Sequence, residues 1–130
     1  MILKQIVYIP RYKWNVVVFY NTKNIDAIID ELESVKCAKC NIDKIIEFLS
    51  KDNVNTGFIY TNKMSRSSVI VICRSTSLGE FVNTIEHEKN HLEMHICDSI
   101  GIDPFSEEAA ILSGEISQIF LDDALSSIIY

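Results

Sequence analysis

Hydrophobic residues change their spacing along the chain, and each spacing predicts a kind of element. Residues 14–20 are rich in β-branched and aromatic side chains, which is typical of a mostly buried strand. Residues 25–35 and 41–49 carry apolar side chains at helical spacing. Residues 57–61 and 68–73 are short β-rich runs around a polar loop, so we expect a hairpin.

The longest helical pattern covers residues 78–100. Ser77 begins it as an N-cap within a capping box, and Gly101 ends it with a left-handed cap. Pro104 prevents continuation, and Ser106 caps a further helix. The apolar residues expected on its core-facing side are Leu78, Phe81, Val82, Ile85, Leu92, Ile96 and Ile100. We therefore expect one α+β domain in the order strand, two helices, hairpin, two helices, with a mixed or antiparallel sheet of about three strands.

Composition and charge narrow the class of protein. The chain has 130 residues, 48% hydrophobic and 23% charged, as expected for a single folded domain at positions 1–130. Its net charge of −6, without a basic cluster, argues against nucleic acid as a partner. With no secretory signal and no run of about 18 apolar residues, we expect a cytoplasmic protein without a membrane partner.

Four cysteines in a cytoplasmic protein are expected to be thiols. Cys37 and Cys40 form a Cys-x-x-Cys, but Cys73 and Cys97 do not supply the second pair that a zinc knuckle needs. The pair also lies at the expected junction of two helices, whereas redox motifs of this kind open a helix after a strand. Small, buried or half-buried side chains are the interpretation that we favour.

The run His87-Glu88-Lys89-Asn90-His91 carries the candidate chemistry. Two imidazoles four residues apart on a helix can share one Zn²⁺, and the carboxylate of Glu88 can act as base toward a metal-bound water. On the expected helix these side chains flank the apolar stripe, which favours the wall of a cleft. The alternative is that His87, His91 and His95 only form hydrogen bonds at an amphipathic boundary.

A catalytic zinc needs three protein ligands, so a third must join the histidines. The next helix offers Glu107 and Glu108 in its first turn and Glu115 two turns later, and a short turn packs that helix against the first. His95 lies one turn beyond His91 and could be that ligand, but residues 87 and 95 are about 12 Å apart along a helix axis. We therefore favour His95 as a hydrogen-bond donor near the metal or as a residue that lines the cleft.

The motif, followed by a glutamate on the next helix, resembles the gluzincin branch of zinc metallopeptidases, particularly its minimal single-domain forms. Residues 84–118 include Ile102-Asp103-Pro104 and Glu107-Glu108-Ala109-Ala110. This stretch also resembles small His-Glu-x-x-His proteins of bacterial phages and mobile elements. The resemblance is specific over about 50 residues, from the hairpin onward.

The resemblance implies a zincin-like fold and a zinc-dependent peptidase acting on a peptide or protein substrate. His87 and His91 would bind Zn²⁺, Glu88 would be the general base, and Glu108 would be the third ligand. The other candidates for that third position are Glu107, Glu115 and His95. In such enzymes the substrate lies antiparallel to an edge strand beside the active helix, for which we expect residues 68–73.

The chain departs from the family pattern in one respect, since no downstream His or Tyr is evident for stabilising an oxyanion. Tyr12 and Tyr60 are available, but the sequence does not place them. Two alternatives therefore stay open: a non-catalytic metal-binding or protein-interaction module of a phage or mobile element, and an α/β binding domain without metal.

Overall fold

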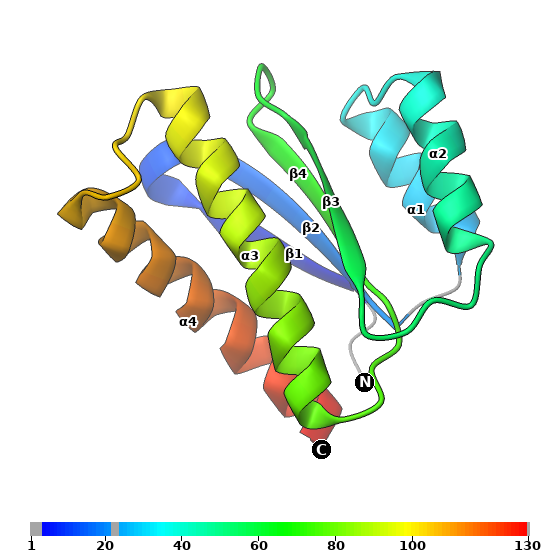
Figure 1. Ribbon diagram of the computed structural model, residues 1–130. Helices are drawn as coiled ribbons and strands as arrows, with labels where there is room; N and C mark the ends of the chain where they lie inside the picture. The colour runs from blue at the N-terminus through cyan, green and yellow to red at the C-terminus, as the bar shows by residue number, and fades with distance from the viewer. Residues whose placement is uncertain (1–3, 22–23, 130) are drawn as a thin grey trace.

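The computed structural model describes residues 4–21 and 24–129, with side chains through residue 122, and shows a four-stranded mixed sheet with helices on both faces (Figure 1). The elements in chain order are β1 (Lys4–Ile9), the 3₁₀ turn η1 (Pro10–Tyr12), β2 (Trp14–Tyr20), α1 (Ile25–Ser34), α2 (Lys39–Leu49), β3 (Gly57–Asn62), β4 (Ser67–Ile72), α3 (Leu78–Ile100) and α4 (Glu107–Ile129). The α+β class and the mixed sheet are confirmed.

The expected number of three strands is wrong, because β1 adds a fourth that pairs antiparallel with β2. Its inward side includes the polar Gln5, whereas its outward side includes Ile6, which is 76% exposed. Polar and apolar residues therefore do not alternate between the two faces of β1, so the sequence shows no strand pattern there. The buried amide of Gln5 forms two hydrogen bonds, accepting one from the Tyr20 hydroxyl at 2.6 Å and donating one to the Ile119 carbonyl at 3.3 Å.

The strand order β1-β2-β4-β3 places β4 in the middle of the sheet and β3 at an edge. β4 pairs parallel with β2 and antiparallel with β3. The prediction that residues 68–73 form an edge strand is therefore wrong. Residues 69–72 are at most 1% exposed, as expected for a strand covered on both faces. The edge strand beside α3 is β3.

Two hydrophobic cores hold the layers together. The larger lies between the sheet and the α3–α4 pair, and the smaller lies between the sheet and the α1–α2 pair (Figure 1). In α3, the predicted core positions Phe81, Ile85, Leu92 and Ile96 are confirmed as buried. Leu78 is 51% exposed, contrary to prediction, because the first turn of α3 projects past the sheet (Figure 1).

The ends of α3 and the start of α4 follow the predicted signals. The Ser77 hydroxyl accepts the Glu80 N–H at 3.1 Å, and Gly101 has a left-handed φ of 85°. The Ser106 hydroxyl then accepts the Ala109 N–H at 3.2 Å. These caps fix a short turn, so α4 returns beside α3 (Figure 1).

The Cys-x-x-Cys pair lies at the α1–α2 junction, as predicted. α2 begins two residues earlier than expected, so the exposed Cys40 is in its first turn, whereas Cys37 is buried. All four cysteines of the chain are free thiols in the structure.

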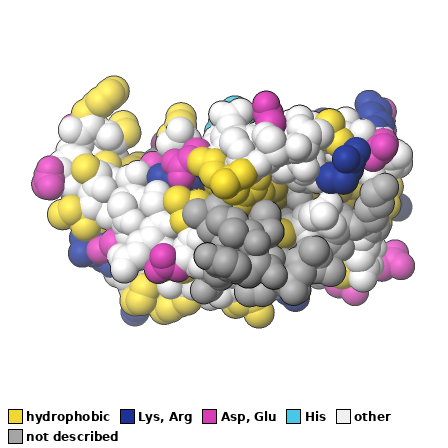
Figure 2. All heavy atoms as spheres, turned by 90° about the horizontal axis from the view of Figure 1, so that it is seen from below, with side chains coloured by type: hydrophobic (Ala, Val, Ile, Leu, Met, Phe, Trp, Pro, Cys, Tyr) yellow, Lys and Arg dark blue, Asp and Glu magenta, His cyan; other side chains and the backbone are white. Residues whose placement is uncertain are grey.

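The surface seen from below shows hydrophobic side chains near its middle, with acidic and basic side chains around them (Figure 2). Among the described helices, none combines the length and the apolar character needed to cross a membrane.

Candidate metal centre

Consecutive turns of α3 bring His87 and His91 together. Their Nε2 atoms lie 3.2 Å apart, and their ring centroids lie 4.8 Å apart. A tetrahedral Zn²⁺ with nitrogen ligands at about 2.0–2.1 Å places two such nitrogens about 3.3–3.4 Å apart. The pair therefore fits one ion with little movement. Without an ion, one ring nitrogen can donate its hydrogen to the other.

Glu88 turns its side chain away from solvent, toward the sheet. Its residue is only 4% exposed, and no described residue donates a hydrogen bond to its carboxylate. Burial raises the pKa of Glu88, although the nearby His87 and His91 oppose this shift. A buried carboxylate of raised pKa beside two imidazoles has the properties of a general base.

A small cavity of about 170 Å³ lies beside Glu88 and reaches His87. It is lined by Asn55, Thr56, Gly57, Asn83, Thr84, His87 and Glu88. The start of β3 and the first half of α3 thus form its walls. A water or a substrate carbonyl in this cavity would contact both His87 and Glu88.

Gly57 permits a close approach of β3 to the backbone of β4 at this cavity. A Cβ atom at position 57 would lie 2.4 Å from the carbonyl oxygen of Val71 and 3.4 Å from Cγ of Glu88. No side chain larger than hydrogen fits there without movement of backbone. The sequence pattern did not identify Gly57 as part of the site. The one signal for it is a glycine at the start of an expected strand, where glycine often marks a close approach of another backbone.

His95 lies one turn beyond His91, with their ring centroids 6.3 Å apart. Its Nδ1 atom is 2.8 Å from the Thr61 hydroxyl of β3, which is itself 2.8 Å from the Ser68 hydroxyl of β4. The indole of Trp14 donates to Ser68 at 3.0 Å. Burial, and then the nearby charges of His91 and Lys63, lower the pKa of His95.

The glutamates predicted as third ligands meet other partners. Glu108 accepts a hydrogen bond from the Tyr12 hydroxyl at 3.0 Å, and Glu115 pairs with Arg11 at 3.0 Å. Glu107 is exposed. Within the described residues, no three His, Cys, Asp or Glu side chains are arranged to hold a metal ion. The structure thus brings His87, Glu88 and His91 together but places no third ligand beside them.

The two tyrosines considered for oxyanion stabilisation are engaged elsewhere. Tyr12 bonds Glu108, and burial and this carboxylate raise the pKa of Tyr12. Tyr60 interacts with Cys37 on the α1–α2 side of the sheet, where burial raises the pKa of Tyr60. Neither hydroxyl is therefore directed at the histidine pair.

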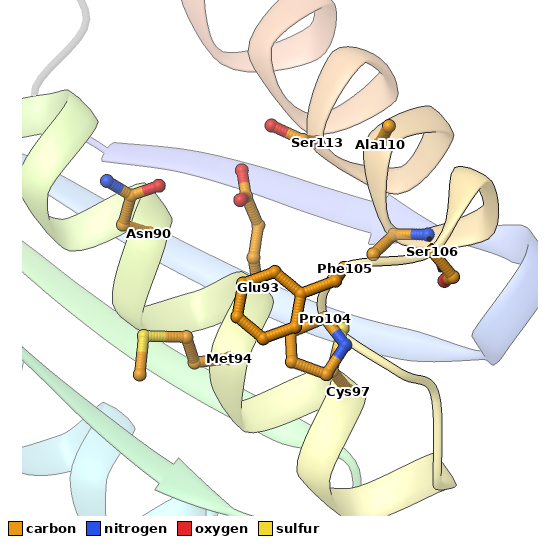
Figure 3. A pocket seen from close by; sticks show the side chains of 10 residues that line it. Asn90, Glu93, Met94, Cys97, Pro104, Phe105, Ser106, Ala110 and Ser113 are labelled. Atoms are coloured by element: carbon orange, nitrogen blue, oxygen red, sulfur yellow. Dashed lines mark hydrogen bonds between the residues drawn. The ribbon is translucent and has the colours of Figure 1, made fainter.

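A larger hollow of about 390 Å³ lies between α3 and α4 (Figure 3). Met94 and Phe105, which are 59% and 95% exposed, border it, and Glu93 points into it from α3 (Figure 3). The buried ammonium of Lys89 donates to Glu93 at 2.7 Å and to Ser113 of α4 at 3.1 Å. Lys89 thereby links α3 to α4 through Ser113, which lines this hollow together with Glu93.

No family model matches the chain, and neither does any curated protein or solved structure. The function of the site is therefore inferred from its geometry and chemistry.

Proposed function

We propose that the protein is a zinc-dependent metallopeptidase in which His87 and His91 bind the ion and Glu88 is the general base. The observation that carries this proposal is the 3.2 Å separation of the two Nε2 atoms, next to a buried carboxylate that shares a cavity with His87. Imidazole nitrogens are ligands that suit zinc, and the spacing fits its tetrahedral geometry.

When bound, Zn²⁺ supplies Lewis acidity that polarises a peptide carbonyl and makes water more acidic. Glu88 takes the proton of the attacking water and delivers it to the leaving amine. Burial suits the carboxylate to this task, because a pKa raised toward neutrality makes the same group a better proton acceptor and then a usable donor.

For the third ligand we propose Glu108, with Glu107 and Glu115 as second choices. The Glu108 carboxylate is exposed and close enough to Cys97 to raise the pKa of that thiol. Cys97 lies about 9 Å beyond His91 along the axis of α3. To reach the ion, Glu108 must give up its hydrogen bond to Tyr12 and move both along α3 and around it, because Cys97 and His91 point about 120° apart on the helix.

The substrate in this proposal is an extended peptide beside β3. As the edge strand next to α3, β3 offers backbone N–H and C=O groups on the side away from β4. An added strand uses main-chain hydrogen bonds, which most peptide sequences can form. β3 takes the role that the sequence had suggested for residues 68–73.

Turnover of a mixed peptide library by zinc-loaded protein tests the proposal. The wild-type protein should cleave peptides, and Glu88→Gln, which keeps the size of the side chain but cannot accept the proton, should be slower by at least about 100-fold. If both proteins hold zinc and neither cleaves any peptide, the peptidase proposal is wrong.

A second candidate function is a protein-interaction module, and the α3–α4 hollow favours it. Residues 78–130 contain eleven Asp and Glu but one Lys, whereas residues 1–77 contain seven Asp and Glu and eleven Lys and Arg. Exposed Met94 and Phe105 add apolar area to this acidic half. The matching partner is a basic protein segment with one bulky apolar side chain.

Fluorescence anisotropy with a labelled Lys- and Leu-rich peptide tests this second function. Binding should weaken several-fold in Phe105→Ala and at high salt, because both the apolar anchor and the charges contribute. The control is Met64→Ala, whose side chain is 98% exposed in the β3–β4 turn. Equal affinity of the three proteins would contradict a binding role for the hollow.

A further inference from the structure

The two ring nitrogens of His95 differ in their hydrogen-bond partners. Nδ1 lies 2.8 Å from the Thr61 hydroxyl, whereas no described residue forms a hydrogen bond with Nε2. Which nitrogen carries the hydrogen decides what His95 can do. A hydrogen on Nε2 makes that atom a donor, and a hydrogen on Nδ1 leaves Nε2 with a lone pair that could bind metal.

A chain of hydrogen bonds that runs from the core to His95 favours one of the two tautomers. It begins at the indole of Trp14, which is fully buried and can only donate. The Ser68 hydroxyl accepts this hydrogen and can donate its own to Thr61, whose hydroxyl can then donate to Nδ1 of His95. In this direction the indole and both hydroxyls have acceptors within the chain, and partly exposed His95 carries its hydrogen on Nε2.

A hydrogen on Nδ1 leaves a hydroxyl hydrogen of this chain without an acceptor among the described residues. If Nδ1 of His95 donated to Thr61, and Thr61 donated to Ser68, the Ser68 hydroxyl would accept two hydrogen bonds. Its own hydrogen would then have no acceptor among the described residues, although Ser68 is only 1% exposed. A buried donor left unpaired costs about 1–3 kcal/mol, which disfavours this arrangement by about 5-fold to 150-fold. If Ser68 donates to Thr61 instead, the hydrogen without an acceptor is that of the partly exposed Thr61 hydroxyl.

We propose that His95 donates a hydrogen bond from Nε2 to an oxygen of the bound substrate and is not the third metal ligand. This inference rests on the proposed peptidase function and adds a catalytic group to the same site. A neutral imidazole N–H stabilises negative charge as it develops on a carbonyl oxygen. The position beside His91, one turn along α3 and against β3, places the donor next to a peptide lying along that strand.

NMR of the histidine ring nitrogens tests the tautomer in metal-free protein at pH 8. We expect a pyrrole-like ¹⁵N shift for Nε2 of His95 and a pyridine-like shift for Nδ1. Thr61→Val should remove this preference, whereas Thr61→Ser should keep it because the hydroxyl remains. Ser67→Ala is the control, since Ser67 bonds to Ser65 outside the chain of hydrogen bonds. A pyrrole-like Nδ1 in the wild-type protein would overturn the assignment.

Zinc affinity separates the donor from a ligand. His95→Ala should bind zinc within about threefold of the wild type, whereas His91→Ala should lose at least about 100-fold. Equal losses in the two variants would make His95 a ligand and overturn the inference.

Turnover then tests the substrate role. His95→Ala should lower kcat by about 10²–10³, as removal of one oxyanion donor does, and His95→Gln should recover part of the rate through its amide N–H. An unchanged kcat in His95→Ala would contradict the role. If the wild-type protein cleaves no peptide, the proposed function itself fails. That outcome differs from the two that overturn only the role of His95, which are a hydrogen on Nδ1 and an equal loss of zinc affinity in His95→Ala and His91→Ala.

Discussion

Gly57 and Glu88 lie beside each other across the β3–α3 interface, and both line the cavity of the candidate site. An added Cβ at Gly57 would lie 3.4 Å from Cγ of Glu88 and 2.4 Å from the Val71 carbonyl oxygen. The missing side chain lets β3 lie close to the backbone of β4 at the cavity that Glu88 also lines. The site thus depends on a backbone position as well as on the motif.

We predict that Gly57→Ala destabilises the protein by about 1–3 kcal/mol, because the added Cβ meets the Val71 carbonyl and forces β3 and β4 apart. Urea unfolding measures this change. Gly114→Ala is the matched control: nothing lies within 4 Å of its added Cβ, and alanine in a helix is favoured by about 0.5–1 kcal/mol over glycine. Equal stability of Gly57→Ala and the wild type would show that β3 can yield at this point.

Glu88 is predicted to make the metal-free protein less stable as pH rises. Because its folded pKa is raised, the folded state favours the protonated carboxyl, and stability is lost as pH climbs from the ordinary value of about 4.3 through the raised pKa. Glu88→Gln cannot ionise, so it should be more stable than the wild type at pH 8. The difference should vanish near pH 4. A difference that stays constant between pH 4 and 8 would contradict a raised pKa.

Lys89 is predicted to stabilise the α3–α4 contact. Its ammonium is 5% exposed and pairs with Glu93 at 2.7 Å and Glu86 at 3.5 Å. Lys89→Met keeps the volume but leaves Glu93 without its cation, which should cost about 3 kcal/mol. The control is Lys4→Met at the exposed pair with Glu31, where the change should stay within about 1 kcal/mol. Similar free energies of unfolding for the two variants would refute the special role of Lys89.

Much of the fold follows from local patterns, and the exceptions have physical causes. Periodicity and caps predict β2, α1 and α3, because each has one apolar face or a buried run. β1 could not be predicted from the pattern, because the hydrogen-bonded Gln5 takes an inward position and Ile6 faces out. The continuous apolar run of residues 69–72 indicates a central strand, but a hairpin pattern alone does not say which of its strands joins the rest of the sheet.

Some features of the site follow from helical spacing alone, whereas others depend on how distant segments pack. Helical spacing alone places His87 and His91 on neighbouring turns, so their 3.2 Å approach could be anticipated. The surroundings of Glu108 depend on how α4 rotates beside α3. That rotation is set by the buried residues Ala109, Leu112 and Ile116, which leave Glu108 beside Tyr12. The proximity of Gly57 and Glu88 likewise arises from packing between distant segments.

Zinc content of protein purified without added metal tests the central claim most directly. We predict about one equivalent in the wild type, and loss of most of it in His91→Ala, because the paired imidazoles provide two of the ligands. Less than about a tenth of an equivalent in the wild type, or the same content in both proteins, would contradict a zinc site at His87 and His91 and favour a domain that functions without metal.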